Sequence, residues 1–233
     1  MIARLMVVLV LLAVTGCAGD PPSASPATPR SSVDGDPRPP AGAETRERSA
    51  GAAAMPERRA GRLPYVFPVR GATSYIRAHH DYPATDIFAR CRTRVVAPVS
   101  GVVLEVRRRD RYRPARNNPA LRGGRFISLR GDDGVRYYGS HLRSLAGRTK
   151  PGARVRAGAM LGRVGQSGNA RGTGCHLHLG ISPVCARAGD WWVRRGTVRP
   201  FRFLRAWERD RDLSPARAVR HWRADHGCPR RPR

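Results

Sequence analysis

Lysine is almost absent from the 233-residue sequence: Lys150 is the only one, although Lys and Arg together number 44 against 17 Asp and Glu. The formal net charge is +27, and the arginines are scattered from Arg58 to Arg233 instead of lining one helix face. Because nucleic-acid-binding domains gather their cations on one face, this pattern argues against nucleic acid as a partner. We expect the charge to attract the chain to an anionic cell envelope.

Long apolar runs are also lacking. The apolar stretch of residues 5–14 is shorter than the roughly 20 residues that a membrane-spanning helix needs. It follows the early cation Arg4 and is typical of a signal peptide, and the letters VTGC that end at Cys17 resemble a bacterial lipobox. We therefore expect residues 1–17 to be a lipoprotein signal peptide with its lipobox, and Cys17 to be lipidated. The chain would then be exported and lipid-anchored at the cell membrane, facing the cell wall.

The cysteines include no C-x-x-C pair, which argues against a cysteine zinc site. Without Cys17 an even number remains, which suits two disulfides in an exported chain; these are Cys91, Cys175, Cys185 and Cys228. A strand from Cys175 through Ile181 would hold Cys175 and Cys185 farther apart than the roughly 7 Å that a disulfide spans. Of the two remaining pairings, both still open, we favour Cys91–Cys175 with Cys185–Cys228.

Composition divides the rest of the chain into three parts. Residues 18–60 are rich in Pro, Ala, Ser and charge and nearly free of large apolar groups, which predicts a disordered tether. From Leu63 the sequence changes to short apolar runs broken by Gly and Pro, which predicts a mainly β domain over residues 61–190. The last part, residues 191–233, has a helical pattern and is expected to pack on that domain.

Three segments of the β domain predict pairs of strands. Residues 94–106 turn at Pro98–Gly101, residues 125–142 form a hairpin that turns at Gly131–Gly134, and residues 152–168 form two short strands around Gly158. This order supports an antiparallel β-sandwich or folded sheet.

Two further segments surround these strands. Residues 107–124 are polar and contain prolines, so we expect a long loop whose arginines form a solvated face rather than a binding patch. In the extension, Ser214 is the expected N-cap of a helix that stops at Gly227, with Trp207 and Trp222 as anchors on the sheet.

Five of the seven histidines fall in three short clusters of the β domain: His79, His80, His141, His176 and His178. The other two, His221 and His226, are expected at the surface of the extension. In GCHLHLG, strand alternation places His176 and His178 on one face and the two leucines on the other. An isolated H-x-H pair is usually an outward-facing polar pair. Here the other clusters add Asp86 and His141, and two histidines with one aspartate suit a catalytic zinc.

The combined pattern resembles the lysostaphin/LytM-type zinc metallopeptidases, which cut peptide bonds in bacterial peptidoglycan. The matching stretches, over residues 63–183, are HHDYPATDIFARCRTRVVAPVSGVV, YYGSHL and LGRVGQSGNARGTGCHLHLGI. They follow the family's order of an H-x-x-x-D pair, a Y-x-H-L motif and a final H-L-H. The resemblance implies the family's β-sandwich or folded-sheet fold, a Zn²⁺ cofactor and peptidoglycan as the substrate.

The resemblance also implies roles for single residues. Asp86 and His178 match metal ligands, whereas His176 and His141 match the two catalytic histidines that do not bind metal. His176 would take the proton of the attacking water, and His141 would donate to the oxyanion or the leaving amine. YYGSHL is one residue longer than the family motif, which leaves the role of Tyr138 open.

The third ligand is less clearly defined. The family's first ligand lies four residues before the aspartate, but here Tyr82 stands there, and the nearest histidines are His79 and His80. We prefer His79 by alignment with the family's HHGID form and keep His80 as the alternative.

Together these features predict a zinc endopeptidase of peptidoglycan cross-links or stem peptides, acting in cell-wall remodelling. The alternative is a catalytically silent wall-binding or amidase-regulating lipoprotein of the same fold. A third reading is a basic envelope protein that binds polyanions. We expect loops 107–124 and 166–174 to decide which bond is cut.

Overall fold

A computed structural model describes residues 64–185 and 190–229. The predicted signal peptide, Cys17 and the tether lie outside the described residues, so these predictions and the localisation stay untested. Within the described residues, no helix is both long and apolar enough to cross a membrane.

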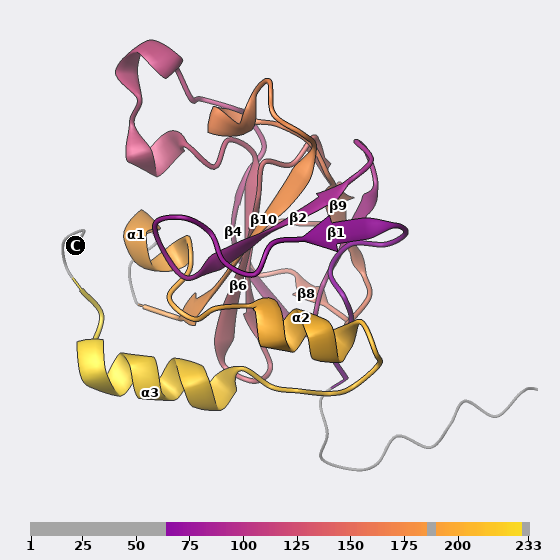
Figure 1. The fold of residues 1–233 in the computed structure, drawn as a ribbon, viewed down its shortest axis with the longest axis vertical. Helices are drawn as coiled ribbons and strands as arrows, with labels where there is room; N and C mark the ends of the chain where they lie inside the picture. Colours follow the sequence, from indigo (N-terminus) through magenta and orange to yellow (C-terminus); the bar gives the residue numbers. More distant parts are fainter. Residues whose placement is uncertain (1–63, 186–189, 230–233) are drawn as a thin grey trace, which may run out of the picture. The chain divides into compact units, whose positions relative to one another are not determined.

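Two antiparallel sheets form the body of the molecule (Figure 1). The larger has the order β1-β2-β10-β6-β5-β4-β8 and the smaller has the order β3-β9-β7. The strands of the larger sheet are β1 (Thr73–Tyr75), β2 (Ala84–Ala89), β4 (Gly101–Arg107), β5 (Phe126–Gly131), β6 (Val135–Ser140), β8 (Arg154–Val155) and β10 (His176–Pro183). Those of the smaller are β3 (Arg94–Val96), β7 (Ser144–Leu145) and β9 (Met160–Arg163). The predicted mainly β, antiparallel fold is thereby confirmed.

The predicted strand pairs form, but they are distributed differently between the sheets. The β5–β6 hairpin turns at Gly131–Gly134, as expected, with the Gly134 N–H donating to the Gly131 carbonyl at 2.9 Å. The strands of segment 94–106 divide between the sheets, because β3 pairs with β9 while β4 pairs with β5 and β8. Segment 152–168 divides in the same way. These two corners carry the chain from one sheet to the other.

Strand β10 lies at the centre of the larger sheet, between β2 and β6, and all eight of its residues are buried. Leu177, Leu179 and Ile181 join the main core, at 1%, 2% and 0% exposure. Strand alternation then turns His176 and His178 to the other face. The disulfide Cys91–Cys175 joins the end of β2 to the start of β10, and Cys185–Cys228 ties the chain after β10 to the end of the extension. This is the pairing that we favoured.

The extension is helical, as predicted, with α1 (Trp191–Arg194), α2 (Phe201–Trp207) and α3 (Ala216–His226). Helix α3 has Pro215 as its N-cap, so the predicted cap at Ser214 is one residue too early; the Ser214 hydroxyl still accepts the Ala216 N–H at 3.2 Å. Gly227 ends the helix with φ +61°.

Only one of the two predicted tryptophan anchors is an anchor. Trp207 is 2% exposed and stacks on Tyr65 with ring centroids 5.3 Å apart. Trp222 is only partly buried and stacks on His226 within its own helix, so its predicted role was wrong. Val219 is the buried residue of α3, which lies at the opposite end of the sheet from loop 107–124 (Figure 1).

Candidate metal centre and active site

Three neighbouring strands bring the strand-borne part of the site together. In the antiparallel register, His178 of β10 lies opposite Asp86 of β2 on one side and Ser140 of β6 on the other. Directly opposed residues of adjacent strands point to the same face. The Nδ1 of His178 lies 2.9 Å from Oδ1 of Asp86. Asp86 is the third residue of β2.

The segment before β2 adds a third group. The His79 N–H donates to the Ala84 carbonyl at 2.9 Å, which folds this segment back on the strand. One ligand atom each from His79, Asp86 and His178 lie within 4.8 Å of one another. His80 is exposed and does not belong to this group. The geometry therefore brings together the three preferred ligands and leaves the alternative outside.

The hydrogen bonds of His178 test whether a metal fits. Its Nε2 lies 3.0 Å from the carbonyl oxygen of Arg195, which can only accept, so Nε2 carries the hydrogen. In neutral His178 the Nδ1 then has a lone pair aimed at the Asp86 carboxylate, another acceptor. Either a proton or a metal cation on Nδ1 resolves this opposition, and a carbonyl that holds the second ring nitrogen is typical of metal-binding histidines. Two imidazoles and one carboxylate are a common catalytic zinc set.

The charge states also suit a metal. Burial by itself would raise the pKa of Asp86, but the hydrogen bond with His178 outweighs burial and helps to hold the pKa at about 2. Burial, followed by the neighbouring His178, lowers the pKa of His79. At neutral pH Asp86 is therefore ionised and His79 neutral, the forms that bind metal ions.

His141 and His176 form a second pair, with ring centroids 4.9 Å apart. The Nδ1 of His141 lies 2.8 Å from the Ser167 carbonyl, and that of His176 lies 2.8 Å from the Gly174 carbonyl. Each Nδ1 thus donates, and each Nε2 keeps a lone pair in the neutral ring. His141 has φ +63°, a conformation uncommon outside glycine, and its N–H is held by the Gly123 carbonyl at 3.0 Å.

Burial lowers the pKa of His141 to about 3, so the ring is neutral at physiological pH. The ring of His141 is then a proton acceptor in the resting protein. His141 can act as the predicted donor only after it has received a proton.

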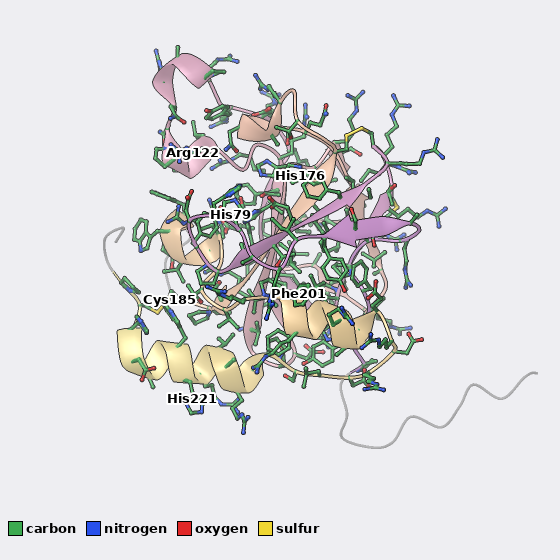
Figure 2. All side chains as sticks on the ribbon, in the orientation of Figure 1. His79, Arg122, His176, Cys185, Phe201 and His221 are labelled. Atoms are coloured by element: carbon green, nitrogen blue, oxygen red, sulfur yellow. A yellow bond between two sulfur atoms is a disulfide. The ribbon has the colours of Figure 1, made fainter. Side chains whose placement is uncertain are left out.

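A cleft opens over the metal-ligand group. Its walls come from residues 79–82, from loop residues 119–123, from the end of β6 and from residues 191–195. His79, His141 and His178 line it, together with Tyr138, which is buried against Phe126. His176 is buried and does not line the cleft. Figure 2 shows His79, His176 and Arg122 on the side of the molecule away from α3.

Sequence reasoning missed Tyr82, Trp191 and Arg195 as parts of this cleft. Arg195 belongs to the predicted extension, and no motif linked it to the histidine clusters. The run WWVRR was the one local signal, because it places two aromatic rings beside two cations.

The loops that we expected to shape the cleft are bonded to each other. Asp110 accepts the Gly168 N–H at 2.9 Å and pairs with Arg171 at 2.5 Å, and the Asn169 N–H donates to the Arg122 carbonyl at 2.9 Å. The first loop also contains two short 3-10 turns, Pro114–Arg116 and Pro119–Leu121. Loops 107–124 and 166–174 therefore form one connected wall.

Most arginines of the first loop are exposed, as a solvated face predicts, but Arg107 is half-buried and both Arg107 and Arg108 also bond to the protein. Arg107 donates to the Ala120 carbonyl at 3.0 Å and covers the Phe126 ring at 4.8 Å. Arg108 donates to the carbonyls of Ala146 and Thr149 at 3.0 and 2.6 Å. These arginines stabilise the loop instead of only facing water.

Comparison with known families adds a finding to this geometry. Residues 80–188 match peptidase family M23. The M23 match includes Asp86, His141, His176 and His178, and it begins one residue after His79. The match and the ligand set together support the predicted Zn²⁺ cofactor.

Solved structures similar to the chain include three peptidases. A protein from Ruminococcus gnavus assigned as a glycyl-glycine endopeptidase LytM is 26% identical, with 64% of this chain and 62% of that chain covered and a TM-score of 0.49. The catalytic domain of lysostaphin from Staphylococcus simulans is 23% identical, with 57% and 92% covered and a TM-score of 0.44. A zinc-containing peptidase from Vibrio cholerae is 19% identical, with 60% and 40% covered and a TM-score of 0.43.

The alignment thus spans less than two thirds of the Ruminococcus and Vibrio proteins. No curated protein matches the chain significantly.

Proposed function

We propose that the protein is a zinc-dependent endopeptidase that hydrolyses peptide cross-links or stem peptides of bacterial peptidoglycan during wall remodelling. One observation carries the proposal: His178 directs Nδ1 at the Asp86 carboxylate while the Arg195 carbonyl fixes its other ring nitrogen. The M23 match supports the class of reaction. The similar proteins whose names refer to lysostaphin and glycyl-glycine endopeptidase suggest the class of substrate.

In this proposal His79, Asp86 and His178 hold the metal. When bound there, zinc supplies a Lewis acid that polarises a carbonyl and makes hydroxide available near neutral pH. The chain's own contribution is to keep Asp86 ionised and His79 neutral, and to fix the ring of His178 through the Arg195 carbonyl.

The remaining histidines manage protons. Peptide hydrolysis adds the oxygen of water to the carbonyl carbon, breaks the C–N bond and transfers a proton to the leaving nitrogen. His176, whose Nδ1 is held by the Gly174 carbonyl and whose ring centroid lies 4.9 Å from that of His141 at the cleft, offers Nε2 as the base. His141 offers Nε2 at the cleft and returns a proton to the leaving amine once it has accepted one.

The proposed setting is the outer side of a cell membrane. Lipidation of Cys17 and the tether over residues 18–60 would place the domain within reach of the wall. The net charge of +27 favours contact with the anionic envelope. This part of the proposal rests on the sequence alone.

Digestion of purified peptidoglycan tests the proposal against the catalytically silent alternative. Walls with direct and with glycine-bridged cross-links are incubated with the zinc-loaded protein, and newly released amino groups are counted. We expect release by the wild type, its loss on chelation and its return with zinc. The variants His176→Ala and His141→Ala should still bind zinc but should no longer release amino groups from the walls. A wild type that binds one zinc and cuts neither wall would overturn the enzyme proposal in favour of the silent one.

A further inference from the structure

Within the described part of the chain, the cleft contains an arginine, Arg195, that forms no ion pair. Resting on the proposed function, we propose that Arg195, assisted by Arg122, binds a free carboxylate of the substrate beside the scissile bond. The enzyme would then select peptides with a free carboxylate at this place over peptides in which that group is amidated.

Two aromatic rings position the guanidinium of Arg195. Its central carbon lies 4.0 Å from the Tyr82 ring centroid and 5.2 Å from that of Trp191. Such contacts use the flat face of the guanidinium and leave its edge, which carries the N–H donors, available. That edge matches a carboxylate in a two-point hydrogen-bonded pair.

The side-chain donors of Arg195 have no acceptor among residues 64–185 and 190–229. Its Nε is buried and has no hydrogen-bond partner. Among the described residues, no carboxylate lies within ion-pair distance of Arg195. The exposed Asp81 also lines the cleft but forms no such pair with it. A buried donor without a partner costs free energy that an incoming acceptor would recover.

The neighbouring arginines clarify this role. Arg194 also lines the cleft, but Glu105 neutralises it at 3.0 Å and its guanidinium covers the Phe126 ring at 4.4 Å. Arg122 has only a neutral partner for its Nε, the Asn117 side-chain oxygen at 3.0 Å. Arg122 and Arg195 line the same cleft, so two cations face it. A carboxylate between these two cations would relieve their repulsion.

Main-chain geometry places this site next to the metal ligands. The carbonyl of Arg195 accepts the hydrogen bond from Nε2 of His178 at 3.0 Å. The Tyr82 ring, whose centroid lies 4.0 Å from the guanidinium carbon of Arg195, has that centroid 5.7 Å from the ring centroid of His178. A carboxylate held there lies close to the reacting carbonyl, so the contact affects which bond is cut.

The test compares two forms of one substrate. Soluble cross-linked peptidoglycan fragments are used directly or after carbodiimide coupling to ammonia, which converts their carboxylates to amides. The zinc-loaded full chain is assayed for kcat/KM by amine release and for Kd by calorimetry. We expect the wild type to prefer the untreated form by about tenfold or more. In Arg195→Gln this ratio should fall close to one.

Other variants separate position from charge. Arg195→Lys keeps the charge but loses the planar fork, so part of the preference should remain. Arg122→Gln should reduce the preference less than Arg195→Gln does. Arg220→Gln removes an exposed cation of α3, outside the cleft, and should keep the wild-type ratio. Zinc content should match the wild type in Arg195→Gln, because the acceptor for His178 is a main-chain atom.

The two proposals fail in different ways. Equal kcat/KM and equal Kd for both forms would overturn the carboxylate site while the endopeptidase proposal stands. Carboxylate-selective binding without cleavage of either form would overturn the endopeptidase proposal while supporting the site. If Arg195→Gln is unstable or loses zinc, the test uses Arg122→Gln and Arg195→Lys instead. The inference is contradicted if both of these variants keep the wild-type ratio of kcat/KM for untreated over amidated substrate.

Discussion

The two halves of the candidate metal centre are held in different ways. Asp86 and His178 lie within neighbouring inner strands of the seven-stranded sheet, where backbone pairing fixes their register. His79 lies on the segment between β1 and β2 and is held by one main-chain hydrogen bond to Ala84 and by contacts with Tyr82 and His178. A site of this kind combines a rigid part, which sets the geometry, with a loop-borne part that can vary without loss of the fold.

Removal of a strand-borne ligand is expected to have the largest effect. Asp86→Asn keeps the shape of the side chain but removes the charge that faces Nδ1 of His178. Loss of an outer-shell partner already costs 10–100-fold in metal affinity, so we expect a loss of about 1,000-fold or more. Competition with a zinc-binding dye measures it. Asp81→Asn is the control, because Asp81 is an exposed residue of the same cleft. Equal losses of zinc affinity in the two variants would contradict the assignment of Asp86 as a ligand.

Removal of each disulfide tests how far rigidity of the sheet supports the metal site. Loops of 84 and 43 residues imply a loss of up to about 4 kcal/mol in unfolding free energy for either bond. Replacement of Cys91 and Cys175 by Ser should also weaken zinc binding, because this bond ends at the start of β10. The Cys185 and Cys228 double variant should lower stability alone. Denaturant unfolding measures the stability of both double variants, and zinc titration measures their zinc affinity. If only the Cys185 and Cys228 variant binds zinc more weakly, rigidity at the start of β10 does not support the site.

The loop-borne ligand should show a smaller loss. His79→Ala removes a half-buried ring that water can replace in part, so we expect zinc affinity to fall about 100-fold. His80→Ala removes an exposed ring outside the ligand group and should bind zinc like the wild type. If only His80→Ala loses zinc, our assignment of the loop-borne ligand is wrong.

The smallest effect concerns the connected wall of the cleft. Burial would raise the pKa of Asp110, but hydrogen bonds from the Gly168 N–H and Arg171 lower it below its ordinary value. Asp110 therefore stabilises the folded state at pH values above about 4, and this contribution disappears as pH falls through its lowered folded-state pKa. Asp110→Asn should lose about 1–2 kcal/mol at pH 7 and little at the lowest pH that keeps the fold. If the difference in unfolding free energy between the wild type and Asp110→Asn is constant from pH 7 to 3, ionised Asp110 does not stabilise the wall in this way.

The same contrast explains how much the sequence could predict. Alternation in GCHLHLG placed His176 and His178 opposite Leu177 and Leu179, because side chains in a strand have a fixed period of two. The glycines at 131 and 134 identified the β5–β6 hairpin. No such period applies before β2, so choosing His79 over His80 needed a resemblance to known proteins and then the fold.

Other features depend on packing between distant segments. The turn near Pro98 gives no sign that β3 and β4 enter different sheets. Arg195 lies 17 residues beyond His178, yet its carbonyl holds that ring. Trp222 has the composition of an anchor, but the face of α3 that is buried carries Val219. These outcomes are set by tertiary contacts, which local patterns do not contain.

A crystal structure of the protein soaked with zinc and measured at the zinc absorption edge tests the central claim most directly. The account predicts one anomalous peak bound by Nδ1 of His178, a carboxylate oxygen of Asp86 and a ring nitrogen of His79, at about 2.0–2.2 Å from each. A peak bound by His80 in place of His79, or a fully soaked crystal with no peak between Asp86 and His178, would contradict it.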